Sequence, residues 1–189
     1  LKAGHPVPIP SIAPTSSLLR WQSTPAIGLR FSRDRAGNHW AVSDRDGDVV
    51  LRFLVDARDD YFAAPLGQGK AHHDPWRPHL SASLKRRIKR LWSMLRVHPD
   101  RLSRGENLRR LSAYFRSFRA GPAPPSRGHA LIDLIVAKRG ICRHRSLAFM
   151  AVAHSLSIPT LLATNDAHAF IEAWVVRENG SEGWLRIDL

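Results

Sequence analysis

The sequence has little cysteine and no long apolar run, and one long stretch of it has few acidic side chains. One cysteine, Cys142, stands among 189 residues, which excludes an internal disulfide and a thiolate-rich zinc site. No run approaches the roughly 18 apolar residues that a membrane-spanning helix needs, so we expect no transmembrane segment. The rest is an ordinary globular composition, with 43% hydrophobic residues and six tryptophans. Such a chain can bury one sizeable core, or one core and a small lobe.

The scarcity of acidic residues is local. The chain has 29 Lys and Arg against 16 Asp and Glu, a formal net charge of +13. Residues 76–119 alone hold thirteen basic and two acidic side chains. A basic surface attracts an acidic protein, a nucleic acid or an anionic membrane. Because no nucleic-acid-binding motif is present, we do not expect specific nucleic-acid recognition, and an acidic protein partner or domain is the interaction that this segment favours.

The composition divides the chain into three segments. Residues 1–25 contain five prolines, which resist both helix and central strand, and we interpret them as a Pro-rich arm or linker. Residues 26–79 combine short β-prone runs with turn signals and a His-rich loop, which predicts a small antiparallel β-meander followed by a loop. Residues 80–189 form the third segment.

Periodic apolar residues predict helices and strands in the third segment. The last two strands are expected to pair antiparallel, because a hairpin turn at 178–181 joins them. The predicted helices cover 81–97, 106–118, 129–138 and 142–156, and the predicted strands cover 160–164, 168–176 and 184–189.

Three side chains of this segment suggest nucleophilic chemistry. Cys142 follows Gly140 at the predicted start of a helix, where free backbone amides and the helix dipole favour a thiolate. His168 begins one strand and Asp188 ends the strand paired with it. The hairpin should therefore bring the carboxylate beside the imidazole, so that the second ring nitrogen can face the thiol. Each residue alone has a plain structural explanation, but their type and order together indicate a Cys-His-Asp triad.

The motifs around these residues resemble the transglutaminase-like superfamily. The matching runs are Lys138-Arg-Gly-Ile-Cys142-Arg-His144, Ser157-Ile-Pro159, His168-Ala-Phe-Ile-Glu-Ala-Trp174 and Gly183-Trp-Leu-Arg-Ile-Asp188. The resemblance covers about residues 105–189. Family members continue beyond the last strand, so we expect a core truncated at its C-terminus.

The resemblance implies a papain-like α+β core, in which the helix that begins at the cysteine packs on an antiparallel sheet. It implies catalysis by Cys142, His168 and Asp188 without a cofactor or metal. The expected reaction is thiol-dependent acyl transfer or hydrolysis at peptide or glutamine carboxamide bonds of a peptide or protein substrate, with hydrolysis favoured over crosslinking. The backbone amide of Cys142 is the one oxyanion donor that we can name.

Two alternatives stay open. The domain could be a non-catalytic binding module that docks an acidic partner, a nucleic acid or a membrane through the basic segment 76–119. It could also be a scaffold with an intact triad and a blocked cleft, obstructed by Arg145 or by the Pro-rich arm.

Overall fold

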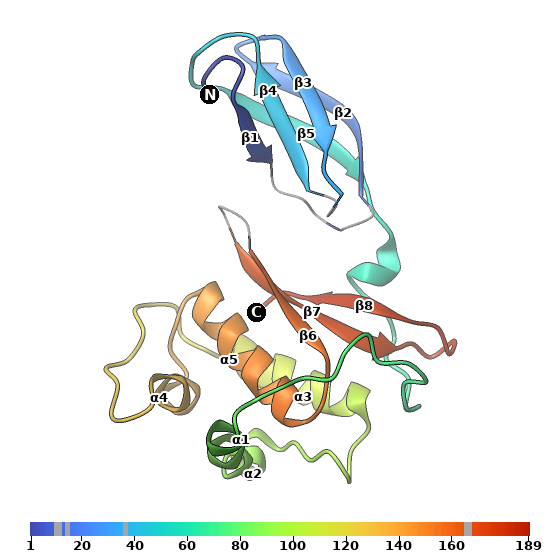
Figure 1. Ribbon diagram of the computed structural model, residues 1–189, viewed down its shortest axis with the longest axis vertical. Coiled ribbons are helices and arrows are strands. Elements are labelled where there is room, and N and C mark those ends of the chain that lie inside the picture. Colours follow the sequence, from blue (N-terminus) through green and yellow to red (C-terminus); the bar gives the residue numbers. More distant parts are fainter. Residues whose placement is uncertain (10–12, 14–15, 36–37, 165–167) are drawn as a thin grey trace. The chain divides into compact units, whose positions relative to one another are not determined.

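The computed structural model describes residues 1–9, 13, 16–35, 38–164 and 168–189. These residues form two compact units, one of residues 1–61 and one of residues 62–164 and 168–189 (Figure 1). The first consists mainly of strands, and the second combines helices with a sheet. All the sheets are antiparallel, so the predicted α+β class is confirmed.

The first unit holds two small antiparallel sheets. One has the order β1-β4-β3, and the other pairs β2 with β5. Their bounds are β1 (Pro6–Ile9), β2 (Ser17–Thr24), β3 (Leu29–Arg33), β4 (His39–Ser43) and β5 (Val50–Asp56), followed by the short 3-10 helix η1 (Asp59–Tyr61). The last three strands lie where the sequence predicts them.

Two features of this unit differ from the predictions. Residues 1–25, interpreted as an arm, contain β1 and β2. Pro6 and Pro8 lie on β1 at the edge of its sheet, where a missing N–H is tolerated. The meander also does not continue into β5, because β1 occupies the second edge of β4 and β5 pairs with the proline-free β2 instead.

The second unit places five helices beside a three-stranded sheet of order β6-β7-β8. The helices are α1 (Ala82–Lys89), α2 (Trp92–Leu95), α3 (Arg104–Arg116), α4 (Ala130–Ala137) and α5 (Cys142–Ser155). The strands are β6 (Thr160–Thr164), β7 (Ala169–Val176) and β8 (Glu182–Ile187). Within the described chain, none of the helices has the length and apolar character needed to span a bilayer.

The core of this unit lies between α3, α5 and the sheet. Phe115 of α3 and Phe149 of α5 are fully buried, with ring centroids 5.7 Å apart. Ala148 and Ala153, also buried, allow α5 to approach its neighbours closely. The described helix that begins at the cysteine thus packs on an antiparallel sheet, as predicted.

The helix predicted over 81–97 is wrong as a single element. It breaks into α1 and α2 at Arg90 and Leu91, and α2 ends at Arg96 with a φ of 57°. The indole N–H of Trp92 donates to the Ser155 hydroxyl of α5 at 3.1 Å. This contact turns Trp92 toward α5, whereas a straight amphipathic helix would keep it near the basic face.

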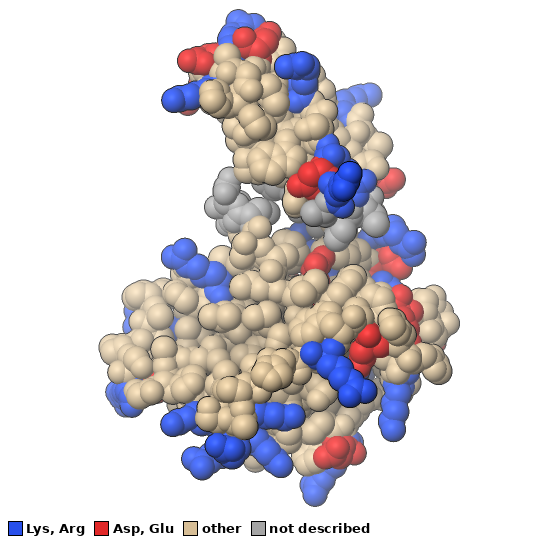
Figure 2. Space-filling view, in the orientation of Figure 1, with Lys and Arg blue, Asp and Glu red and all other residues tan. Residues whose placement is uncertain are grey.

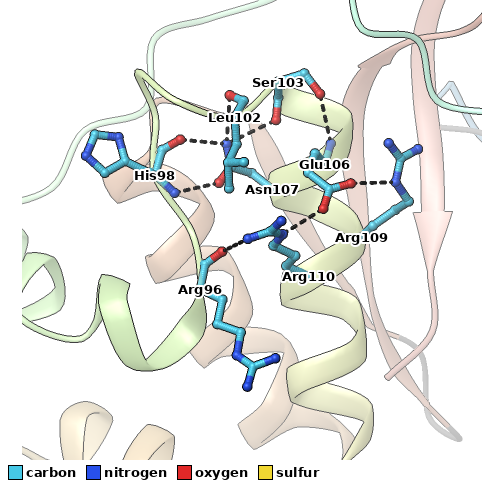
Figure 3. Close-up of polar contacts among 8 residues, drawn as sticks. All are labelled: Arg96, His98, Leu102, Ser103, Glu106, Asn107, Arg109 and Arg110. Carbon is cyan, nitrogen blue, oxygen red and sulfur yellow. Dashed lines mark hydrogen bonds and ion pairs between the residues drawn. The ribbon is translucent and has the colours of Figure 1, made fainter.

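A buried asparagine holds the loop between α2 and α3 (Figure 3). The amide nitrogen of Asn107 donates to three backbone carbonyls, those of His98, Leu102 and Ser103, at 3.0 to 3.2 Å. Its oxygen accepts the N–H of His98 at 2.9 Å. The Ser103 hydroxyl caps α3 by accepting the N–H of Glu106. The loop therefore depends on one amide side chain that both donates and accepts.

We predict that Asn107→Asp destabilises the protein by about 2–4 kcal/mol at neutral pH, because a buried carboxylate would face three carbonyl oxygens. Urea denaturation measures this loss. Asn179→Asp is the matched control, since Asn179 only accepts, from the N–H and the hydroxyl of Ser181. Equal stability of the two variants would contradict the role given to Asn107.

Candidate functional site

Cys142 is the first residue of α5, and the residues around it explain why the helix starts there. Ile141 is extended, and its N–H donates to Nδ1 of His144 at 3.3 Å. Gly140 lies so close to His144 that an added Cβ would be 2.8 Å from the His144 Cβ. Glycine is therefore required at this position for the ring of His144 to reach back over the helix start.

The loop before Cys142 is fixed by further hydrogen bonds. Nε of Arg145 donates to the Gly140 carbonyl at 2.9 Å, so this side chain folds back onto the loop. The N–H of Gly140 donates to the carbonyl of Arg119 at 3.0 Å, and the N–H of Arg119 donates to the carbonyl of Lys138 at 2.9 Å. The segment that follows α3 thus helps to place the start of α5.

The amides at the start of α5 point to a site for negative charge. The N–H groups of His144 and Arg145 both donate to the Ile141 carbonyl. Those of Cys142 and Arg143 have no acceptor among the described residues. The first amides of a helix lack a partner within the helix, and they can donate to an anion.

His168 and Asp188 are in direct contact. Nε2 of His168 lies 3.0 Å from Oδ1 of Asp188, and the two side chains are 34% and 50% exposed. His168 directly precedes β7, and Asp188 directly follows β8. Since β7 and β8 are antiparallel neighbours, the hairpin brings the two residues together as the sequence predicts.

Asp188 is held by two arginines. Nε and Nη2 of Arg186 donate to its two carboxylate oxygens, each at 2.9 Å, and Nε of Arg116 donates to its backbone carbonyl at 2.9 Å. Partial burial raises the pKa of the Asp188 carboxyl, but the hydrogen bonds and charges of Arg186 and His168 outweigh that effect and lower the pKa. The carboxylate therefore stays ionised beside the imidazole.

Arg186 is itself fixed by an aromatic ring. Its guanidinium lies 3.9 Å from the ring centroid of Phe170, and its side chain is 16% exposed. A cation over an aromatic face is attracted by the ring's electrons. The ring of Phe170 thus supports the guanidinium of Arg186, which in turn binds the carboxylate of Asp188 and orients it toward His168.

A buried hydroxyl connects the helix of Cys142 to the strand of His168. The hydroxyl of Ser146, one turn after Cys142, donates to the carbonyl of Ala169 at 3.2 Å, and Ser146 is fully buried. Ala169 directly follows His168, so this bond ties the first turn of α5 to the first residue of β7. Cys142 is half-buried and, within the described part of the chain, makes no side-chain hydrogen bond with His168 or Asp188.

The structure therefore brings together two of the three predicted site residues and places the third on a neighbouring element. Glu172 lies opposite Arg186 in the β7–β8 register. In the described ranges, no group of three or more His, Cys, Asp or Glu residues forms a metal-binding arrangement.

The sequence analysis missed two residues that support this site, Arg186 and Ser146. Both were detectable from spacing alone. Arg186 lies two residues before Asp188, which puts both on one face of an extended strand. Ser146 lies four residues after Cys142, which puts both on one face of a helix.

We predict that Arg186→Gln raises the pKa of the Asp188 carboxyl, because this change removes its nearest cation. A carbon NMR titration of the aspartate carboxyl groups measures the shift. The lowered pKa stabilises the folded state above the unfolded-state pKa, and this contribution is lost as the pH falls through the folded-state pKa. The variant should therefore lose stability at neutral pH and little at strongly acidic pH.

Arg143→Gln is the control, because Arg143 is exposed and makes no contact with Asp188. If Arg186→Gln leaves the titration of Asp188 unchanged, the arginine does not set the charge of this carboxylate.

Comparison with known proteins found one distant structural similarity and no matching family. No protein-family model matches the chain, and no curated protein matches it. Among solved structures, it is similar to one described as "a Putative Cysteine Protease" from Cytophaga hutchinsonii, with a TM-score of 0.46 and 12% sequence identity. The match covers 99% of this chain and 77% of that chain. A likeness at this level assigns neither a fold family nor an activity.

Proposed function

We propose that residues 80–189 are a papain-like, transglutaminase-like catalytic core in which Cys142, His168 and Asp188 catalyse thiol-dependent hydrolysis of peptide or glutamine carboxamide bonds. The observation that carries this proposal is the 3.0 Å contact between His168 and Asp188. His168 directly precedes the strand β7. Through its hydrogen bond to that strand, Ser146 connects the helix of Cys142 to the same place.

The proton transfer follows from which ring nitrogen is engaged. Because Nε2 of His168 contacts Asp188, Nδ1 takes the proton of the Cys142 thiol. Asp188, which the cation of Arg186 keeps ionised, stabilises the imidazolium that forms. Catalytic contacts of this kind often tighten only when substrate binds.

Acyl transfer then proceeds in two steps. The thiolate of Cys142 attacks the carbonyl carbon, a C–S bond forms, and the C–N bond breaks as His168 returns its proton to the leaving amine or ammonia. The amides of Cys142 and Arg143 donate to the developing oxyanion. In the second step water attacks the thioester, His168 accepts a proton from the water, and the thiol and a carboxylic acid are released.

Water is the acceptor that we favour, because hydrolysis needs no second binding site. A lysine amine in place of water would make the same thioester a crosslinking intermediate. A non-catalytic docking module is the alternative of another class, and the two experiments below separate it from an enzyme.

We predict that iodoacetamide labels Cys142 about tenfold or more slowly in His168→Ala than in the parent at about pH 6, because the variant lacks the imidazolium that stabilises the thiolate. Cys142 is the only cysteine, so intact mass follows this one site. His79→Ala is the control, since His79 is exposed and belongs to the same unit. Equal rates in all three proteins would contradict an activated Cys142–His168 pair.

We also predict that a fluorescent casein is cleaved faster than dansylcadaverine is incorporated into a glutamine peptide, because water is the favoured acceptor. Cys142→Ala should abolish both reactions, and Asp188→Asn should slow turnover by about a hundredfold or more. Faster amine incorporation would reassign the chain as a crosslinking enzyme. Rapid labelling of Cys142 without turnover of either probe would contradict the proposed substrates, because the thiol would then be activated but act on neither class.

A further inference from the structure

The basic segment 76–119 contains two kinds of cation. Some are paired within the fold: Arg104 contacts Asp74 at 2.7 Å, and Arg109 and Arg110 share the carboxylate of Glu106. Others find no carboxylate among the described residues, including Arg96 and those of α1. Figure 2 shows Lys and Arg side chains around the lower part of the second unit, where Figure 1 places α1 and α2, with few acidic side chains between them. This unpaired charge is available to a partner.

Part of that charge surrounds a groove between α2, α3 and the end of α4. The hollow measures about 570 Å³, and its wall includes the cations Arg96, Arg110 and Lys138. Its lining also includes two exposed apolar residues, Met94 and Ala113, which we call the floor. None of the described Asp or Glu residues lines it. We call this hollow, together with the one that adjoins it, the basic groove.

The adjoining hollow extends the positive lining. It measures about 640 Å³ and shares Ser117 and Lys138 with the first. It adds Arg119 and Arg139, and no acidic residue of the described ranges lines it. Neither arginine pairs with a carboxylate in the part of the chain that the structure describes. The two hollows share lining residues, and together they expose four cations that no carboxylate of the described residues neutralises: Arg96, Arg119, Lys138 and Arg139.

The apolar floor favours a peptide over a nucleic acid. Single-stranded nucleic acid is bound by stacking its bases on exposed aromatic rings. Among the described residues, Tyr114 is the one aromatic residue that lines the groove, and Nζ of Lys138 lies 4.3 Å from the centroid of its ring. Met94 and Ala113 add an exposed thioether and an exposed methyl group to the lining, and both suit an aliphatic side chain.

A second copy of the chain fits this groove poorly, because the net charge is +13 and the excess lies in the same region. An acidic segment with apolar side chains between its carboxylates matches both the wall and the floor.

We propose that the basic groove binds an acidic peptide segment of a partner protein, with carboxylates paired to Arg96, Lys138, Arg119 and Arg139 and an aliphatic side chain seated on Met94 and Ala113. This binding does not require the thiol chemistry proposed above, so Cys142→Ala should bind the segment as tightly as the parent.

We test this with a fluorescein-labelled peptide of alternating glutamates and leucines, measured by fluorescence anisotropy at about 0.15 M salt. Reversing two groove charges, with Arg96→Glu and Lys138→Glu, should weaken binding by about tenfold or more. The control reverses two α1 charges, with Arg86→Glu and Arg87→Glu, and should change affinity by about threefold or less. Replacing the peptide's leucines with serines should also weaken binding, because the floor then has no apolar contact.

A second variant tests the groove without altering its charge. Met94→Ser removes the thioether from the floor at an exposed position of α2, and it should weaken peptide binding while leaving the thermal midpoint nearly unchanged. Equal losses in the groove and α1 variants would overturn the proposal in favour of unspecific attraction. So would tighter binding of an oligothymidine than of the peptide, with the same groove variants abolishing it.

Discussion

The packing of α5 against β7 is the interaction on which the candidate site depends. Small buried residues, among them Ser146 and Ala148, bring the helix close to the strand, and the Ser146 hydroxyl bonds to the backbone beside His168. Because Ser146 is fully buried, a larger side chain at position 146 would push the two elements apart. Cys142 belongs to the helix and His168 to the strand, so the spacing between thiol and imidazole follows from core packing more than from any direct contact.

Charge is distributed by two different rules in the second unit. Around Asp188 the cations are paired within the fold. Arg186 binds the carboxylate and packs on the ring of Phe170, and Arg116 binds the backbone carbonyl of Asp188. In the basic groove, Arg96, Arg119, Lys138 and Arg139 have no carboxylate partner among the described residues. A paired cation sets the ionisation of one carboxylate, whereas unpaired cations set a field that acts on molecules from outside. The excess of arginine therefore serves two purposes that the net charge alone does not distinguish.

The sequence predicted well the helices and strands whose ends are set by neighbouring residues in the chain. The strand at 160–164 and the helix from Cys142 have the predicted starts, because Pro159 and Gly140 break the chain beside them. Contacts between residues far apart in the sequence were not predictable in the same way. The strand β5 pairs with β2 and not with β4, and a hydrogen bond from Trp92 to Ser155 accompanies the break between α1 and α2. In the site, the hairpin predicted the His168–Asp188 contact, while the separation of Cys142 from His168 depends on helix-to-sheet packing that periodicity does not describe.

The loop before Cys142 shows why the matching motifs do not by themselves make a site. Gly140 must lie against His144, Arg145 must reach back to the carbonyl of Gly140, and the N–H of Gly140 must find the carbonyl of Arg119. The last of these partners follows α3, well before the motif run begins. Without α3 and the segment after it, this amide would lose its acceptor, and the helix start would lose one of its fixed points. The position of the thiol is therefore a property of the whole helical layer together with the sheet, and a shorter piece restricted to the motif residues would not reproduce it.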